Sequence, residues 1–506
     1  MSITGPGSIT AANVTAQTNM MNQLNTLSEE LGTGQAAQTY SDLGPQAGVA
    51  VALGAQLSQL NGYSNTATAV GTTLSIAQSA LSALGSAGSD VQQAISQQGA
   101  FALDNTGQTA VQESAASYLD QILSLLNTQV GGNYIFSGSA VNQPSVASTA
   151  AILDGTGAQA GLTQLIAQRQ QADLGNGLGR LSVAVTGGGS NIVTVSQDGS
   201  PFGFQLASVN SSLNGATVSG PSGSPPSLSV DFTSNPNPGD SIAFNLTLPD
   251  GSTQTITLQA TANSPPGANQ FTIGATPADT AANLQTALTG AIGNLAQTAL
   301  PAASVIAAAD DFFNSDPPQI VDPGSPPDYA TAMSLANGTP ANTVFWYTGE
   351  NGSTPALQTA TAEVGPGTSI AYGMRATEQG IASLVANVAA LAATSFFSPS
   401  NPNAQAGYQA LCQSVVANLS GQPGVQTISD IQANIANAQT IVKNASALNT
   451  QTQTTLQDML QGMEGVNQTQ IGEDILTLQN NLSASMSVTA RLAQLSLVNY
   501  LAPVSG

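Results

Sequence analysis

The sequence contains no histidine and only one cysteine, Cys412. Without histidine, a Ser-His-Asp triad and every His-ligated metal site are excluded, and a lone cysteine excludes an intramolecular disulfide. Cys412 lies at helical spacing with Tyr408, Leu411 and Val415, which indicates a buried structural thiol rather than a nucleophile. We therefore expect a protein that is not an enzyme, with no catalytic residues, no cofactor and no metal site.

Basic residues are scarce as well. Five Lys plus Arg stand against 27 Asp plus Glu, the formal net charge is -22, and no basic residue precedes Arg169. We expect no nucleic-acid partner, because binding to phosphates requires a basic surface. The chain also lacks a continuous apolar run that would span a bilayer, and its first residues lack the cationic and apolar regions of a cleaved signal. We therefore expect neither membrane insertion nor a cleaved signal.

Two groups of acidic residues are candidates for carboxylate chemistry. Their members are Asp310, Asp311, Asp316, Asp322 and Asp328 in the middle of the chain, and Glu473 and Asp474 near its end. Paired carboxylates serve glycosidases or bind calcium. The spacing matches no EF-hand loop, and the sequence has no phosphate-binding glycine loop ending in Lys-Ser or Lys-Thr. We interpret both groups as solvated surface.

Apolar residues near both termini repeat at alternating spacings of three and four. This is the heptad pattern of a helix that packs against another helix. The residues of this pattern are Val14, Met20, Leu24, Leu27 and Leu31 near the N-terminus, and Ile471, Ile475, Leu478, Leu482, Leu492 and Leu495 near the C-terminus. Neither stripe can be buried alone, so the simplest arrangement pairs the two ends and displays the middle of the chain.

The same spacing predicts further helices. One helix of about forty residues carries Leu53, Leu57, Leu60, Leu74, Leu81 and Leu84 on its apolar face. Others are predicted over 109–129, 161–174, 381–391 and 428–463. In the helix over 161–174, Arg169 and Asp173 are spaced to form an ion pair across one helical turn.

Between residues 181 and 350 the pattern changes to the alternation of half-buried strands. Candidate strands are 181–185, 191–195, 202–206, 241–248 and 254–260. Thr276 and Pro277 predict the start of one helix that runs to Ala299 and docks on the sheet. The fold class is therefore mainly α with a β-rich insert: the N- and C-terminal segments form a long helical coiled coil or bundle.

Four motifs resemble bacterial flagellin. They are GGNYIFSGS at 131–139, which also predicts a short strand or hairpin, DLGNGLGRL at 173–181, YGMRATEQGIASLVANVAALA at 372–392 and VTARLAQLSLVNYL at 488–501. The resemblance covers 1–180 and 366–506. It is most detailed with the alphaproteobacterial type and with a relative, the hook-filament junction protein, and the alternative of a junction protein that adapts hook to filament therefore stays open.

The resemblance implies a secreted structural subunit for motility, exported unfolded through the flagellar type III apparatus and assembled with itself into a helical filament. The heptad-spaced residues named above, from Val14 to Leu84 and from Ile471 to Leu495, are then expected to form the self-assembly seam. Its implied partners are hook-associated and cap proteins, and an export chaperone at the C-terminal segment. The implied organisation has five segments. They are an inner-core helix with its loop at 1–45, a helical shell with a hairpin at 46–180, an outward β-rich variable domain at 181–365, a second helical shell at 366–465 and a second inner-core helix at 466–506.

Overall fold

A computed structural model describes residues 6–36, 39–395 and 402–500 of the 506-residue chain. The described residues form two compact units. The terminal unit takes in the described parts of 1–69, 363–369 and 441–506, and the central unit takes in those of 70–362 and 370–440. The two ends of the chain therefore share one unit, and the fold class predicted from the sequence is confirmed: long helices at both ends and a β-rich middle region.

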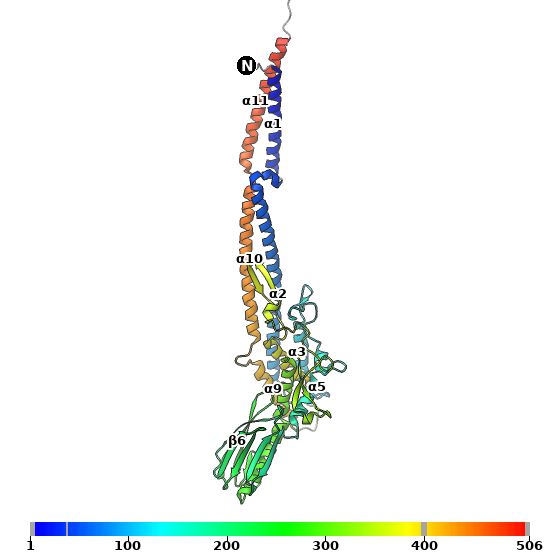
Figure 1. Ribbon diagram of the computed structural model, residues 1–506, viewed down its shortest axis with the longest axis vertical. Coiled ribbons are helices and arrows are strands. Elements are labelled where there is room, and N and C mark those ends of the chain that lie inside the picture. Colours follow the sequence, from blue (N-terminus) through cyan, green and yellow to red (C-terminus); the bar gives the residue numbers. More distant parts are fainter. Residues whose placement is uncertain (1–5, 37–38, 396–401, 501–506) are drawn as a thin grey trace, which may run out of the picture. The chain divides into compact units, whose positions relative to one another are not determined.

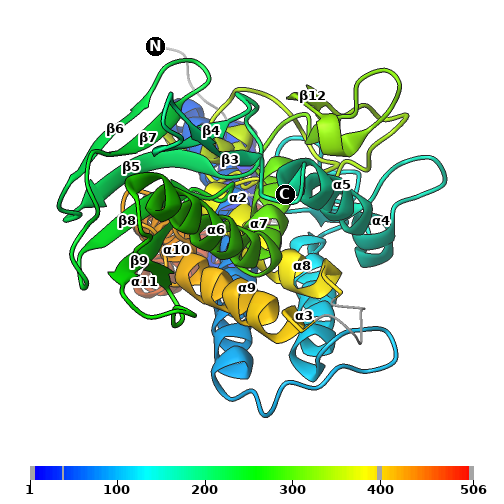
Figure 2. The same cartoon turned by 90° about the horizontal axis from the view of Figure 1, so that it is seen from below.

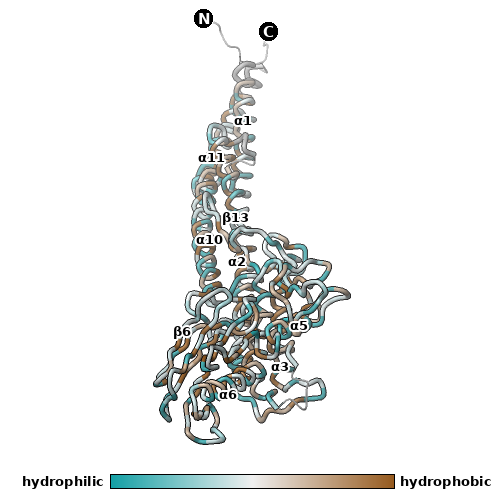
Figure 3. Tube along the Cα trace, turned by 60° about the horizontal axis from the view of Figure 1, so that its bottom comes forward, coloured by the Kyte–Doolittle hydropathy of each residue, from teal (hydrophilic) through white to brown (hydrophobic). Residues whose placement is uncertain are grey.

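Helices α1, Pro6–Thr33, and α11, Gln468–Tyr500, pack against each other in the terminal unit (Figure 1). They run antiparallel, because Gln17 hydrogen-bonds Thr489 while Gln35, just after α1, bridges Gly465, just before α11. Two longer helices contribute to both units: α2, Ala47–Ser96, and α10, Ile428–Glu464. A 3₁₀ helix, η1 at Tyr40–Gln46, comes directly before α2. All four helices are rich in heptad-spaced apolar residues, and Figure 3 shows apolar segments recurring along α10 and α11.

The end of α1 and the end of α10 are tied together by the backbone. The amide of Ala36 donates to the carbonyl of Glu464 at 2.7 Å, and the amide of Val466 donates to the carbonyl of Gly34 at 3.2 Å. Gly34 has a φ of 72°, a left-handed conformation that lets the chain leave α1 and that glycine adopts without a steric penalty. Both breaks in the helices therefore fall at one level of the terminal unit.

A two-stranded hairpin, β13 at Thr361–Gly365 and β14 at Thr368–Ala371, also supplies residues to the terminal unit. Asn449 of α10 donates from its side-chain amide to the carbonyl of Val364 at 2.7 Å. Asn449 is only 1% exposed and occupies a heptad position between Ala445 and Thr452. A buried amide at such a position fixes the register of its neighbours, because an unmade hydrogen bond would be costly there.

The central unit is built around helix α7, Ala299–Phe313, nearly all of whose residues are buried. It packs against α5, Leu162–Leu174, α8, Gln379–Ala393, and α9, Ala404–Leu419. The surrounding elements are α3 (Ala110–Leu126), α4 (Thr149–Asp154), β1 (Gln129–Val130), β2 (Asn133–Tyr134), β11 (Gln319–Asp322), β12 (Ser334–Asn337), and the 3₁₀ helices η2 (Tyr329–Thr331) and η3 (Ala356–Thr359).

Eight strands of the central unit form two four-stranded sheets. The antiparallel sheet has the order β3-β4-β7-β6, and the second sheet has the order β10-β9-β8-β5 with β10 parallel to β9. Helix α6, Pro277–Gln297, packs on strands of both sheets and closes their common core (Figure 2). The bounds are β3 (Leu181–Thr186), β4 (Ile192–Gln197), β5 (Gln205–Ser211), β6 (Ala216–Ser222), β7 (Ser227–Phe232), β8 (Ser241–Thr247), β9 (Thr253–Thr261) and β10 (Gln270–Thr272).

The start of α6 is confirmed. The hydroxyl of Thr276 accepts from the amide of Asp279, the carboxylate of Asp279 accepts from the amide of Thr276, and Pro277 is the first helical residue. The sequence did not predict α7, because its Ala-rich, uniformly apolar stretch carries no one-sided stripe. Strands β6 and β7 were missed too. Gly220 and Pro221 interrupt the alternation of β6, whereas the alternation of β7 is regular and did carry the signal of a strand.

Among the described helices, none alone has both the length and the apolar character of a membrane span. Only α6 and α7 taken together have that composition, and they are bent by 43° where they join.

The conformation of Gly34 can be tested by substitution. We expect Gly34→Ala to destabilise the pairing of α1 with α11 by about 1 kcal/mol, because a Cβ is disfavoured at positive φ. Hydrogen exchange of α1 amides measures this directly. Gly32→Ala is the matched control, since Gly32 lies inside α1 with open space around its Cβ position and alanine favours helix. Equal exchange rates in the two variants would contradict the role assigned to Gly34.

Candidate self-association surfaces

One face of α1 and one face of α11 are covered where the two helices pack together. The covered positions are Asn13, Gln17, Met20, Leu24 and Leu27 on α1, and Ile471, Ile475, Leu478, Leu482, Ser485 and Thr489 on α11. Both sets keep alternating spacings of three and four, the pattern of a two-stranded coiled coil. The structure therefore places Met20, Leu24 and Leu27, and Ile471, Ile475, Leu478 and Leu482, on the less exposed faces of two helices that pack together.

Three other residues of the predicted seam lie at or beyond its edge. Val14 is 54% exposed, because its neighbour Asn13 takes the covered position. Leu31 is 38% exposed, because the covered face passes through Glu30 as α1 approaches its end. Leu492 follows Thr489 by three residues but remains 37% exposed, and the side chain of Leu495 lies outside the described residues.

A polar layer extends the seam beyond Leu482. The side-chain amide of Gln17 donates to the hydroxyl of Thr489 at 3.0 Å and lies 3.4 Å from the hydroxyl of Ser485. A search for apolar residues misses these positions, although the heptad count from Met20 and Leu482 passes through them. Such a layer costs stability and favours one register, because a shift along the helices would leave a partly buried amide unpaired.

The predicted face of α2 is also covered within the chain. In the terminal unit Leu53 and Leu60 are buried and Leu57 is half-buried. In the central unit Leu74, Leu81 and Leu84 are fully buried. These six side chains therefore stabilise the fold of the single chain.

A second set of apolar side chains remains exposed. Apart from Leu174 and Met333, all large exposed apolar residues in the described part of the chain belong to the terminal unit. They are Val14, Met21, Leu31, Val49, Val51, Ile441, Leu448, Met459, Leu476, Met486, Val488 and Leu492, which we call the outer apolar set. Val14 with Met21 and Ile441 with Leu448 are seven residues apart, so each pair shares one side of its helix. Apolar surface gathered in this way is typical of protein association sites.

The ionic residues of the central unit form internal ties. Arg169 donates from Nε to Asp173 at 3.0 Å and from Nη1 to Asp311 at 2.5 Å. The pair of Arg169 with Asp173 was predicted. The interpretation of Asp311 as solvated surface was wrong, because α7 turns it towards the buried guanidinium of Arg169 and leaves its side chain 22% exposed. Asp173 also accepts from the amide of Gly203 at 2.8 Å, which links α5 to the chain entering β5.

The two other arginines of this unit are buried and paired. Arg180 donates to Asp198 at 2.8 Å and to the carbonyl of Ala172 at 2.6 Å, and Arg375 pairs with Glu350. The other acidic candidates, Asp310, Asp316, Asp322, Asp328, Glu473 and Asp474, are exposed. No group of three or more Cys, Asp or Glu residues suited to a metal occurs in the described part of the chain. Cys412 is buried, as predicted, and burial raises the pKa of its thiol.

Two of the motifs identified in the sequence lie side by side. The amide of Gly138 donates to the carbonyl of Met374 at 3.0 Å, and the amide of Ala376 donates to the carbonyl of Phe136 at 2.9 Å. Phe136 is fully buried, and the hairpin of β1 and β2 spans 129–134, so it overlaps only the start of the strand or hairpin predicted at 131–139. Segments 131–139 and 372–392 therefore form one joint in the central unit.

Comparison with protein families gives a match for the N-terminal part of the chain. Residues 8–141 match the bacterial flagellin N-terminal helical region, which takes in α1, α2, α3 and the hairpin of β1 with β2. This match supports a bacterial flagellin-family protein, a structural family without enzymatic activity. The search of curated proteins found no match.

The pairing of Asp311 generates a prediction on pH. Burial raises the pKa of Asp311 to about 6, the charges of Asp310 and Asp173 add to the rise, and Arg169 opposes it. Because the folded pKa lies above the ordinary value, the protonated form is favoured in the folded state. Protonated Asp311 therefore contributes on the order of 3 kcal/mol to the free energy of unfolding below about pH 4, and this contribution is lost as the pH rises through about 6.

We therefore expect Asp311→Asn to gain stability relative to the native chain between about pH 4 and pH 7, because asparagine has no carboxylate to ionise. Urea unfolding at fixed pH values measures the difference in unfolding free energy. Asp90→Asn, at an exposed position of α2, serves as the matched control and should follow the native chain. A pH-independent difference between Asp311→Asn and the native chain would show that Asp311 does not titrate as described.

Proposed function

We propose that this protein is a subunit of the bacterial flagellar filament and polymerises with itself through the helices of its terminal unit. The observation that carries this proposal is the outer apolar set, which lies on the four long helices that contribute to the terminal unit. A protein that functions alone would leave this surface in water. The match of residues 8–141 to the flagellin N-terminal helical region supports the same conclusion.

In this proposal the two sides of each terminal helix have different partners. The seam of Met20, Leu24 and Leu27 with Ile471 through Leu482 holds α1 and α11 of one subunit together. The outer residues, such as Leu448 and Leu476, then contact helices of neighbouring copies. Val14, Leu31 and Leu492 belong to this outer group, and Leu495 continues its spacing. The buried residues of α2 hold that helix within its own chain, while Val49 and Val51 remain exposed.

The same function implies further partners and a route. We propose that the chain is secreted through the type III export apparatus, that a chaperone binds its C-terminal segment before export, and that hook-associated and cap proteins adjoin the filament. A bacterial flagellum would then be its location. A terminal unit whose two helices bury each other suits this route, because it forms only once both ends of the exported chain are available.

A hook-filament junction protein is the second candidate. Its typical ending and aromatic turn are similar to LSLVNYL at 495–501 and to GNYIFSG at 132–138, so neither motif separates the two functions. The size of the β-rich region favours the filament subunit. A filament subunit extends a seed in proportion to the protein added, whereas a junction protein adds a short, limited segment.

The outer apolar set can be tested without breaking the seam. Leu476 is 62% exposed on α11, whereas Leu478, two residues later, lies in the seam. We expect Leu476→Asp to abolish polymerisation while the subunit stays folded, because a carboxylate at a subunit contact costs several kcal/mol. Electron microscopy of seeded protein measures polymerisation, and hydrogen exchange reports the pairing of α1 with α11.

Leu478→Asp is the comparison variant, and it should lose both polymerisation and the protection of α1. Glu473→Gln, at an exposed position of the same helix, should behave like the native chain in both measurements. Normal filaments from Leu476→Asp would show that the outer apolar set does not form the contact between subunits.

The β-rich domain can be removed at a point where its ends meet. A Cβ on Gly179 would lie 2.9 Å from Leu300 Cδ2, so the chain before β3 passes beside the start of α7. We expect polymerisation to persist when 181–298 is replaced by a short Gly/Ser linker. Because this deletion removes Asp198, the partner of Arg180, the variant also carries Arg180→Gly. Glycine suits the φ of 68° at this position and removes an unpaired buried charge.

Filament mass per unit length, measured by scanning transmission electron microscopy, should fall. A longer deletion, 181–313, is the matched control, because it also removes α7 and should prevent the central unit from folding. A folded 181–298 deletion that fails to polymerise would mean that the β-rich domain supplies essential contacts between subunits.

A further inference from the structure

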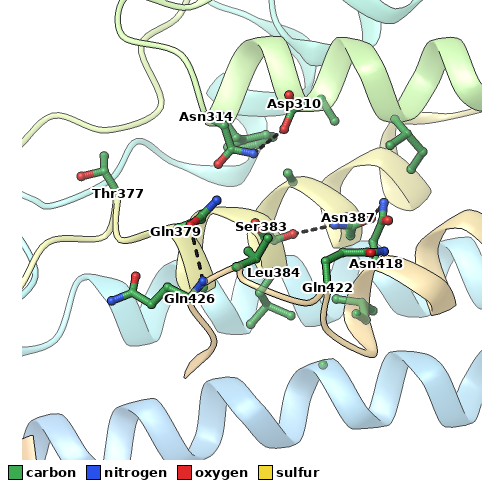
Figure 4. Close-up of a pocket in the computed structure, with 18 of the residues that line it drawn as sticks. Asp310, Asn314, Thr377, Gln379, Ser383, Leu384, Asn387, Asn418, Gln422 and Gln426 are labelled. Carbon is green, nitrogen blue, oxygen red and sulfur yellow. Dashed lines mark hydrogen bonds between the residues drawn. The ribbon is translucent and has the colours of Figure 1, made fainter. Parts of the chain in front are cut away.

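The central unit contains a groove of about 1010 Å³ that the function proposed above does not use. Its walls come from α2, α7, the first half of α8 and the connection between α9 and α10 (Figure 4). The volume is at the upper end of the range for small-molecule sites. We propose that this groove binds a neutral oligosaccharide.

Side-chain amides dominate the polar lining. Gln379 and Asn387 come from α8, Asn418 from α9, and Gln422 and Gln426 from the connection that follows. Each amide carries both a hydrogen-bond donor and an acceptor, as does each hydroxyl of a sugar. A ligand with many hydroxyl groups and no charge matches this lining better than one that only donates or only accepts.

Several of these amides are held in place by neighbours and still have unused groups. Asn418 donates to Asn387 at 3.0 Å, and Asn387 donates to the carbonyl of Ser383 at 2.8 Å, so the side-chain oxygen of Asn418 stays available. Gln379 accepts from the backbone amide of Gln426 at 3.4 Å, which leaves its NH₂ group as a donor. Gln422 makes no side-chain hydrogen bond within the described chain. Figure 4 shows Asn387 beside Asn418, and Gln379 beside Gln426.

The charged groups at the groove disfavour an anionic ligand. Four carboxylates line it, and each accepts a hydrogen bond within the chain: Asp250 from Ser252, Asp310 from Asn314, Asp311 from Arg169 and Asp316 from Asn351. Arg169 is the only basic residue of the lining, and Asp173 and Asp311 hold its buried guanidinium, so an anion finds no available partner. The side-chain amides outnumber the carboxylates in the lining, so we expect recognition to depend on neutral hydrogen bonds.

Apolar groups complete the lining. Leu84 and Gly88 of α2, Leu384 of α8 and the half-buried ring of Phe345 form non-polar parts of the groove. The C–H faces of sugar rings pack against such surfaces, because burying them removes apolar area from water. The groove thus offers the two kinds of surface that a pyranose presents.

Gly85 allows the groove to be blocked with little risk to the fold. It lies inside α2, lines the groove, and has nothing within 4 Å of its Cβ position. A leucine there would occupy the groove and would favour the helix. Gly290→Leu is the matched control, since Gly290 lies inside α6, also has open space at its Cβ position, and does not line the groove.

Isothermal titration calorimetry of the unpolymerised full chain tests the proposal with a set of neutral tetrasaccharides: tetra-N-acetylchitotetraose, cellotetraose, maltotetraose and mannotetraose. We expect saturable millimolar or tighter binding of at least one. Gly85→Leu should abolish it, Gly290→Leu should retain it, and Gln379→Ala or Asn418→Ala should each weaken it about tenfold through the loss of a hydrogen bond.

Deacetylated, cationic chitotetraose and a sulfated tetrasaccharide provide the charged comparison. Binding of a charged tetrasaccharide alone would overturn the proposal, as would no binding of any neutral one or equal binding to Gly85→Leu and the native chain. The measurement uses free subunits, so it succeeds or fails independently of polymerisation.

Discussion

The apolar repeat of 3.5 residues in the long helices is the constraint on which the rest of the structure depends. A helix with this repeat carries a continuous stripe that it cannot cover itself, so α1 needs a partner helix. That partner is α11, from the opposite end of the chain, which lies antiparallel to it. Their pairing requires the breaks after α1 and after α10 to fall together, which the bonds of Ala36 with Glu464 and of Val466 with Gly34 achieve. The same geometry leaves the opposite sides of these helices in water, where the outer apolar set lies.

Scarcity of basic residues shapes the central unit in a different way. Its three arginines are all buried, and each joins elements distant in sequence: Arg169 joins α5 to α7, Arg180 joins the end of α5 to the loop after β4, and Arg375 joins the chain before α8 to Glu350. A buried guanidinium is stable only with its carboxylate and carbonyl partners in place, so these pairs favour one packing of the unit over others. The exposed charges of the unit are consequently all negative.

The sequence predicts those parts of the fold that depend on local spacing. The seam from Ile471 to Leu482, the start of α6 at Thr276 and the pair of Arg169 with Asp173 all follow from neighbours a few residues apart. The position of Val14 is different, since polar Asn13 and Gln17 take the seam and only the partner helix decides between them. Asp311 and Asn449 could not be predicted for a similar reason: their partners are Arg169 and Val364, far away in the chain. The amides of the groove come from several elements and share no local pattern.

The burial of the arginines also affects how the protein meets proteases that cleave after basic residues. Arg169, Arg180 and Arg375 are nine-tenths or more buried, so the folded chain exposes only Lys443 and Arg491 to such enzymes. Both lie inside long helices, where the backbone must open locally before it fits an extended protease site. Because no basic residue precedes Arg169, even an unfolded N-terminal third offers trypsin-like enzymes no cleavage site. Such a chain is suited to surroundings rich in these enzymes.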